Sequence, residues 1–193
     1  MKNAILVPGM PYKDEHYDPR LPSNSEAHWF SWLKRQLIIK DIHAIAIEPP
    51  FPYKPRYEDW KKEFERFDIT PETILVGWSC GGGFLVRYIC ENKDIKVGKV
   101  VLVAPWINPY KDKNYDTADF FNFNIDANFP KRTKSITIFI SNDDESDVLK
   151  TVEILKREVS GLVFKEYKDK GHFTSNDIGT TEFPEILEVI LAD

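Results

Sequence analysis

The chain has few cysteines and no apolar run long enough to cross a membrane. Cys80 and Cys90 are the only cysteines among its 193 residues. They are too few for a disulfide scaffold or a cysteine-ligated zinc site, so we expect reduced thiols. The apolar runs are strand-sized, far below the roughly 20 residues of a bilayer span, and the first residues lack the apolar stretch of a signal peptide. The sequence therefore predicts a soluble, cytoplasmic protein without a membrane partner.

A surplus of positive charge is also missing. Lysine and arginine together number 26 against 31 aspartates and glutamates, which gives a formal net charge of −5. The basic residues are scattered among acidic ones, a distribution that argues against a nucleic-acid surface. The phosphate-binding patterns G-x-x-x-x-G-K-[ST] and G-x-G-x-x-G are absent as well. We therefore expect neither a nucleic-acid partner nor a nucleotide cofactor.

The chain does contain a series of short apolar runs rich in β-branched residues. They are Ala4 to Val7, Ile42 to Ile47, Thr73 to Gly77, Lys99 to Ala104, Ser135 to Ser141 and Leu162 to Tyr167. Most of these runs are continuous rather than alternating, as in parallel strands that are covered on both faces. Helical patterns lie between them. The sequence therefore predicts an α/β fold, a doubly wound, mostly parallel sheet of about six strands with helices on both faces, in a single domain over residues 1–193.

Three segments between the strands have features of their own. Ser23-x-x-Glu26 reads as a capping box, and the apolar residues that follow it predict a helix. Residues 10–22, with three prolines directly after the first strand, predict a loop over the carboxyl edge of the sheet, either a lid or a long connector. Residues 106–134 predict a short helix with loops.

The most informative stretch runs from Gly77 to Gly81 and reads Gly-Trp-Ser-Cys-Gly. It matches G-x-S-x-G, a pattern that matters when a strand precedes it and a helix follows, as predicted here. Glycines two residues before and after Ser79 permit the sharp turn that lifts a side chain above the sheet. Ser79 is therefore predicted to be a nucleophile, the alternative being a structural turn. The sulfur of Cys80 is expected to point away from the turn, so that only its backbone N–H contributes.

A nucleophilic serine needs a base and a group that orients the base. Asp143 and Asp144 follow one later strand and His172 follows the next. The order Ser, Asp, His is that of the α/β-hydrolase fold. Either aspartate could be the orienting acid, and both could be ordinary turn residues. The three other histidines have no motif around them and are expected to be structural; they are His16, His28 and His43.

Two further roles are predicted around the serine. The backbone N–H groups of Cys80 and Met10 are candidates for an oxyanion hole, Met10 because it follows the first strand and is not a proline. The stretch around Met10 could equally be a simple tight turn. Trp78 and Trp106 are candidates for the wall of an apolar acyl pocket, with core packing as the equal alternative.

With these residues in place, the chain resembles the small serine hydrolases related to retinoblastoma-binding protein 9 and to YdeN of bacilli. The stretches that carry the resemblance are HWFSWLKRQL (28–37), PRYEDW (55–60), GWSCGG (77–82), VVLVAPW (100–106), SNDDESD (141–147) and KGHF (170–173). The resemblance implies an α/β-hydrolase without a large cap domain, and a triad of Ser79, Asp144 and His172, because the second acid of the family's pair is the triad member. The chain departs from the family at Trp78, where histidine is common, and at Asp147, where an apolar residue is usual.

We therefore expect a serine hydrolase that cleaves a small ester, thioester or amide through an acyl-enzyme. Its partner would be a small-molecule acyl substrate, and neither a metal nor an organic cofactor is required. One alternative is a protein that keeps the fold but acts by protein binding. Another is acyl transfer to an acceptor other than water, which would use the same residues.

Overall fold

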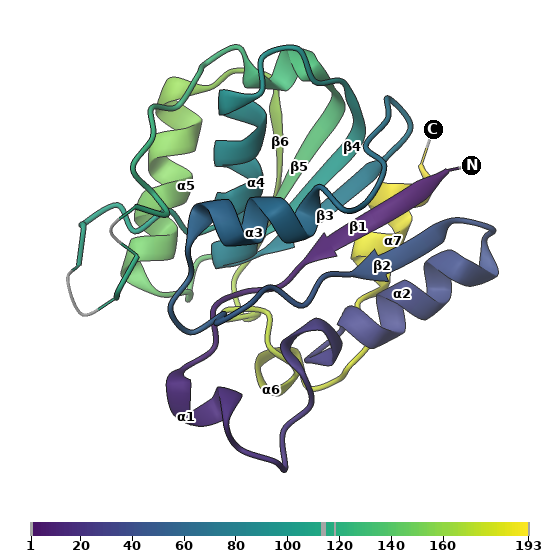
Figure 1. Ribbon diagram of the computed structural model, residues 1–193, viewed down its shortest axis with the longest axis vertical. Coiled ribbons are helices and arrows are strands. Elements are labelled where there is room, and N and C mark those ends of the chain that lie inside the picture. Colours follow the sequence, from purple (N-terminus) through teal and green to yellow (C-terminus); the bar gives the residue numbers. More distant parts are fainter. Residues whose placement is uncertain (1, 113–114, 118, 193) are drawn as a thin grey trace.

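Six parallel strands form one sheet in the computed structural model, which describes residues 2–112, 115–117 and 119–192. The strands are β1 (Asn3–Val7), β2 (His43–Ala46), β3 (Ile74–Trp78), β4 (Val97–Val103), β5 (Thr133–Ser141) and β6 (Leu162–Tyr167). Their order in the sheet is β2-β1-β3-β4-β5-β6 (Figure 1). Every pairing is parallel. Each predicted run therefore corresponds to one strand, and the predicted parallel sheet is confirmed.

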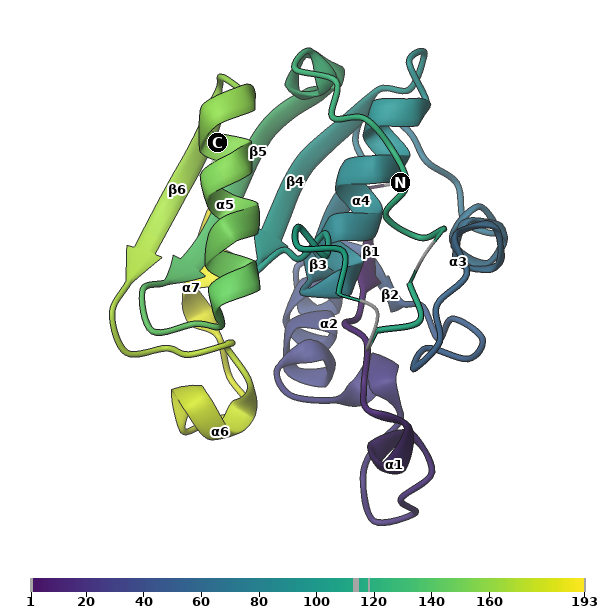
Figure 2. The same cartoon turned by 90° about the vertical axis from the view of Figure 1, so that its left-hand side faces the viewer.

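Helices cover both faces of this sheet. On one face lie α3 (Tyr57–Phe64), α4 (Cys80–Glu91) and α5 (Ser146–Glu158), and on the other lie α2 (Phe30–Ile39) and α7 (Pro184–Leu191) (Figures 1 and 2). The central strand β3 is buried along its whole length, which explains its continuous apolar sequence. The doubly wound α/β architecture is thus confirmed. None of the helices among the described residues is long and apolar enough to cross a membrane.

One local prediction about helices was wrong, and one helix was missed. Ser23 makes no side-chain capping bond; residues Asn24–Glu26 form a single 3-10 turn, η1, and α2 begins only at Phe30. The capping-box pattern is short and common, and here a backbone bond from Glu26 N–H to the Ser23 carbonyl (2.9 Å) forms instead. Helix α3 was not predicted at all. Its buried residues are aromatic, a type that is also frequent in strands.

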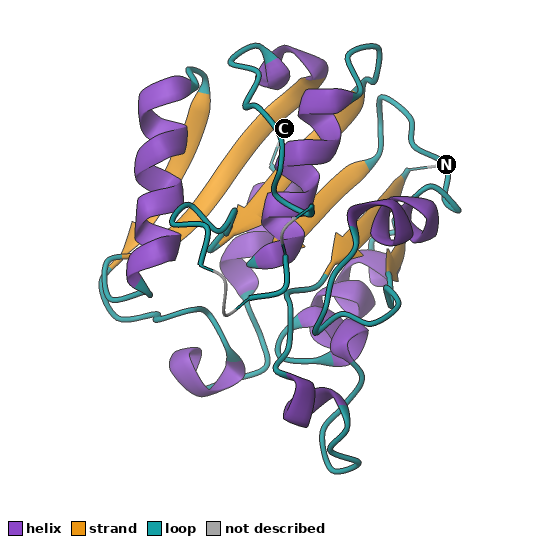
Figure 3. Ribbon diagram, turned by 60° about the vertical axis from the view of Figure 1, so that its left-hand side comes forward, coloured by secondary structure: helices purple, strands orange, loops and turns teal. Residues whose placement is uncertain are grey.

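The carboxyl ends of the strands all point to one end of the molecule, where two short helices lie beyond the sheet. They are α1 (Lys13–His16) and α6 (Ser175–Ile178) (Figure 3). Helix α1 is a single turn inside the predicted loop 10–22. Within the described part of residues 106–134, the regular helix is the 3-10 element η2 (Phe129–Arg132); residues 113, 114 and 118 lie outside the described residues. In open parallel sheets, ligands bind at this end.

Candidate active site

Ser79 occupies the sharp turn between β3 and α4. Its backbone has φ 53° and ψ −122°, a conformation that is costly for a non-glycine residue and persists only where the surroundings enforce it. Three backbone hydrogen bonds do so here. The Ser79 N–H donates to the Val103 carbonyl (2.9 Å), and the Ser79 carbonyl accepts from the N–H groups of Gly83 (3.1 Å) and Trp106 (3.0 Å). The turn therefore has the strained geometry of a nucleophile elbow.

The two glycines of the pattern are required by close backbone contacts. A Cβ atom on Gly81 would lie 2.3 Å from the carbonyl oxygen of Val7, and one on Gly77 would lie 2.7 Å from the carbonyl oxygen of Gly81. Backbone atoms cannot move away from such contacts without disturbing β1 or the start of α4. The small residues on both sides of Ser79 thus allow the elbow to sit directly on the first strand.

Asp144 and His172 are joined by a hydrogen bond. The Nδ1 atom of His172 lies 2.9 Å from Oδ1 of Asp144, whose side chain is completely buried. Because a carboxylate can only accept, Nδ1 carries the proton and Nε2 is left as a potential base. Burial lowers the pKa of His172, but the hydrogen bond and charge of Asp144, with the charges of Glu145 and Asp177, outweigh burial and raise the pKa above its ordinary value.

Asp143 has a different position. Its Oδ1 accepts hydrogen bonds from the hydroxyl of Ser141 and from the backbone N–H of Gly171 (3.1 Å). The hydrogen bond from Ser141 is the main reason that the pKa of Asp143 is lowered. Of the two candidate acids, the structure brings Asp144 to the imidazole and Asp143 to the backbone of the loop that carries it.

The loop around His172 is held by side chains from three other parts of the chain. The indole N–H of Trp78 donates to the His172 carbonyl (2.8 Å), and that of Trp29 donates to the Phe173 carbonyl (3.1 Å). The Oδ2 atom of Asp177 accepts from the His172 backbone N–H (3.1 Å). The bonds to the carbonyl and the N–H of His172 therefore fix the backbone that carries the imidazole, while Trp29 anchors the next residue of the loop.

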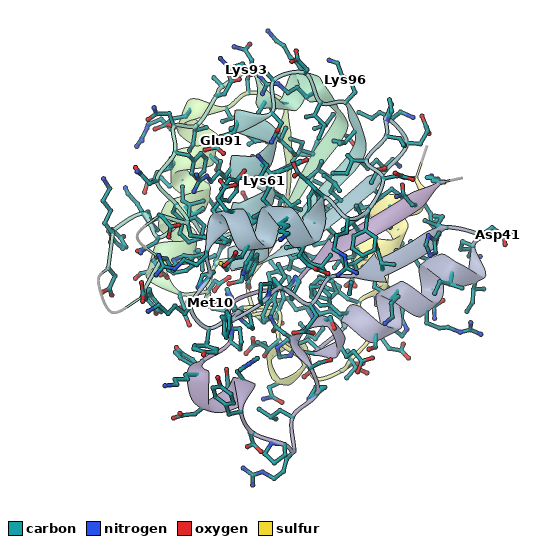
Figure 4. All side chains as sticks on the ribbon, viewed as in Figure 1. Met10, Asp41, Lys61, Glu91, Lys93 and Lys96 are labelled. Carbon is teal, nitrogen blue, oxygen red and sulfur yellow. The ribbon has the colours of Figure 1, made fainter. Side chains whose placement is uncertain are left out.

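Ser79 and His172 line the same cleft, which has a volume of about 1030 Å³. Met10, Trp78 and Trp106 line it too, so the structure brings together most of the predicted site residues. Figure 4 shows Met10 at this end of the sheet, far from Lys93 and Lys96 at the opposite end. Among the described residues, Ser79 Oγ makes no hydrogen bond to His172; such contacts are often long without a substrate.

Two backbone N–H groups, that of Cys80 directly after Ser79 and that of Met10 in the wall of the same cleft, have no protein acceptor within the described residues. Cys80 opens α4, so its N–H has no partner inside the helix. The N–H of Met10 belongs to the Gly9–Met10 peptide, whose carbonyl oxygen accepts from the Asn24 side-chain amide (2.8 Å). Because a trans peptide directs its C=O and N–H to opposite sides, Asn24 fixes the direction of the Met10 N–H.

The tryptophans and the cysteine beside the serine are mostly buried. Trp78 is 8 % exposed and Trp106 is 5 % exposed. Both indoles therefore belong mainly to the core, while their remaining surface lines the cleft. The thiol of Cys80 is fully buried, and burial raises its pKa well above the ordinary value. A reactive thiolate is not available there.

Sequence reasoning missed three residues of this site. Asn24 and Asp177 orient backbone groups, and only the tertiary structure reveals which groups they reach. His28 lines the cleft as well, although no motif surrounds it. Its position next to Trp29, at the start of a predicted helix, did not indicate that its side chain faces the cleft. Within the described residues, no cluster of three or more His, Cys, Asp or Glu side chains is arranged to hold a metal ion.

Comparison with known proteins identifies the family. The sequence model of the family described as serine hydrolase matches residues 19–192. The chain belongs to the serine hydrolase family. Among curated relatives, YdeN of Bacillus subtilis, which is named as a hydrolase, is 24 % identical over 177 residues, covering 87 % of this chain and 89 % of YdeN. These matches support a YdeN-like hydrolase.

Several solved structures share the fold. The crystal structure of the B. subtilis ydeN gene product has a TM-score of 0.80 at 24 % identity and covers 98 % of this chain and 97 % of its own. An esterase from Exiguobacterium antarcticum has a TM-score of 0.64 at 13 % identity, covering 100 % and 92 %. Est1E of Butyrivibrio proteoclasticus, solved with ferulic acid bound, has a TM-score of 0.65 at 10 % identity, covering 98 % and 86 %. The chain therefore has the α/β-hydrolase fold.

Proposed function

We propose that this serine hydrolase cleaves a small ester, thioester or amide through an acyl-enzyme formed on Ser79. His172 removes the proton of Ser79 and gives it to the departing alcohol, thiol or amine; the neutral imidazole then activates water, which releases the acid from Ser79. Asp144 holds the imidazole in the required tautomer. The observation that carries the proposal is the 2.9 Å bond between Asp144 and His172 in the cleft that the strained Ser79 turn also lines.

The negative charge that develops on the substrate carbonyl oxygen needs donors aimed at it. The N–H groups of Cys80 and Met10 fill this role in the proposed mechanism, since neither has a protein acceptor among the described residues; Cys80 directly follows Ser79, and Met10 lines the same cleft. The cleft-facing parts of Trp78 and Trp106 form the wall of the acyl pocket. The reaction as proposed uses only groups of this chain and water.

The remaining parts of the proposal rest on the sequence. We propose one catalytic domain over residues 1–193, a small-molecule acyl substrate and a cytoplasmic location; the two cysteines, both unpaired and buried, agree with a reducing compartment. Kinship with the wider group around retinoblastoma-binding protein 9 stays a prediction from the quoted motifs.

A fluorescent fluorophosphonate, which labels activated serines, tests the function directly. We expect the wild-type protein to be labelled and the variants Ser79→Ala and His172→Ala to lose labelling. Ser31→Ala, an exposed serine on α2, is the matched control and should be labelled like the wild type. A folded wild-type protein that stays unlabelled would contradict the proposal. Wild-type protein that has not been treated with the probe is then assayed on esters of graded acyl length.

A further inference from the structure

His28 lies in the cleft with Ser79 and His172, although the mechanism above gives it no part. Its ring packs edge-on against the indole of Trp78, with 4.7 Å between ring centroids, and the Trp78 indole lies 5.4 Å from the ring of His172. A single indole thus separates the two imidazoles. The surface of the cleft around Ser79 and His172 therefore includes His28.

The tautomer of His28 is fixed by its neighbours on α6. The backbone N–H of Ser175 donates to Nδ1 of His28 (3.2 Å), and the Ser175 hydroxyl lies 3.3 Å from the same atom. A backbone N–H can only donate, so Nδ1 uses its lone pair and the ring hydrogen is on Nε2. Burial lowers the pKa of His28, and the charge of His172 adds to this, while the charges of Asp177 and Glu15 oppose it.

The Nε2–H group of His28 is free to bind a ligand. Nε2 has no hydrogen-bond partner among the described residues, and it is not one of the buried polar atoms sealed from solvent. The backbone of His28 has φ +54°, a left-handed conformation that a non-glycine residue adopts at a cost. The surrounding structure therefore maintains a strained, partly buried residue whose Nε2–H is a single, oriented donor that is not sealed from solvent.

The charge of the cleft limits which acceptor groups of a ligand the Nε2–H of His28 can bind. The described residues that line the cleft include no lysine or arginine, and they include the carboxylates of Glu15, Asp18, Glu48, Glu145, Asp147 and Asp177. An anionic acceptor would be repelled there, whereas an uncharged oxygen would not.

We propose that His28 is a specificity-determining residue whose Nε2–H donates a hydrogen bond to an uncharged oxygen of the substrate other than the scissile carbonyl. This inference rests on the proposed esterase function. It predicts that the enzyme prefers esters that carry an ether, carbonyl or amide oxygen over esters of the same shape with a methylene group in its place. The oxygen can belong to the acyl part or to the alcohol part, and the test separates the two.

Two pairs of isosteric esters provide the measurement. The first pair, the 4-nitrophenyl esters of 3-methoxypropanoic and pentanoic acid, differs by one oxygen in the acyl part. The second pair, the acetates of 2-methoxyethanol and butanol, differs by one oxygen in the alcohol part. We expect the wild type to favour the oxygen-containing member of one pair in kcat/KM by about three- to tenfold over the ratio for alkaline hydrolysis, the size of one neutral hydrogen bond.

His28→Leu should abolish this preference, and His28→Gln, which keeps a terminal N–H donor, should restore part of it. His43→Leu, at an exposed position of β2, should leave the ratio unchanged. A wild type that is labelled by the fluorophosphonate but shows no preference in either pair overturns the role of His28 alone. So does a labelled, folded His28→Leu variant with the wild-type ratio. An unlabelled wild type overturns the proposed function and this inference with it.

Discussion

The indole Nε1 of Trp78 donates a hydrogen bond of 2.8 Å to the carbonyl oxygen of His172, so the residue before the proposed nucleophile holds the backbone of the proposed base. The two residues, one at the end of β3 and the other in the loop after β6, are 94 positions apart in sequence. The bond gives Trp78 a positioning role besides its place in the cleft wall, and it couples the strained serine turn to the imidazole.

Trp78→Phe should lower kcat by about ten- to a hundredfold, because loss of this bond lets the imidazole shift relative to Ser79. Trp29→Phe is a matched control, since the Trp29 indole makes a similar bond to the Phe173 carbonyl but does not line the cleft. Both variants should lose thermal stability. Steady-state kinetics of the two folded proteins should show the large kcat loss only for Trp78→Phe, and equal losses would contradict the positioning role.

Substitution of the two neighbouring aspartates, Asp143 and Asp144, should have clearly different effects on kcat. Asp144→Asn removes the charge beside His172 Nδ1 and permits the wrong tautomer, so kcat should fall by roughly 10⁴-fold. Asp143→Asn weakens the bonds to Ser141 and Gly171, so we expect a lower melting temperature and a loss of kcat below about tenfold. The reverse ranking of the two kcat values would make Asp143 the orienting acid.

The raised pKa of His172 predicts opposite effects of pH on activity and stability. A base must be neutral, so kcat/KM on an uncharged ester should fall toward acid with an apparent pKa above about 6.5. A group with a raised folded-state pKa contributes stability that is fully present below its unfolded pKa and is lost as the pH rises through its folded pKa. The contribution of His172 to the melting temperature should therefore decline over the same interval in which activity rises.

Asp144→Asn is the control for this pH dependence. Without the carboxylate, burial dominates, so the pKa of His172 should drop and the acid limb of the residual activity should move to lower pH. NMR titration of the His172 ring in both proteins measures the shift directly. An unchanged His172 titration in Asp144→Asn would show that the carboxylate does not raise the pKa.

Asn24 should matter for the reaction although it is distant from Ser79 in sequence. Asn24→Ala frees the Gly9 carbonyl and with it the direction of the Met10 N–H, so kcat should fall by about tenfold with little change in KM. The rate of fluorophosphonate labelling should fall in parallel. Ser25→Ala, one residue along and without a bond to Gly9, should behave like the wild type. If Asn24→Ala has the same kinetic constants as the wild type, the proposed role of the Met10 N–H in the oxyanion hole is contradicted.

Gly81→Ala should destabilise the protein by about 3 kcal/mol or more, because the new methyl group would lie 2.3 Å from the Val7 carbonyl oxygen. Gly161→Ala is the comparison. Its φ of +84° makes alanine strained, but no atom lies within 4 Å of the added carbon, so a loss of about 1–2 kcal/mol is expected. Urea unfolding of both variants measures the difference, and equal losses would mean that the elbow can relax.

Much of the fold could be predicted from the sequence because its signals are local. The continuous apolar run of β3 identified a strand buried on both faces, and the alternation of strands with helical patterns led to the parallel sheet. Local signals also misled. The capping box at Ser23 competes with other short-range bonds, and the aromatic face of α3 does not distinguish helix from strand. Short patterns like these are decided by tertiary packing.

For the candidate site, the sequence by itself determined the types and the order of the reactive groups. Ser79 lies between glycines after the third predicted strand, the aspartate pair follows the fifth strand, and His172 follows the sixth. Strand–turn–helix context is local, so it can be read along the chain. The residues alone left Asp143 and Asp144 open, and the family resemblance implied Asp144; the contact itself, in which Asp144 and not Asp143 reaches the imidazole, is decided by the tertiary structure. The physical reason is that a hydrogen bond of about 3 Å requires two side chains to point toward each other. Residues far apart in sequence can do so only when the sheet brings their loops together.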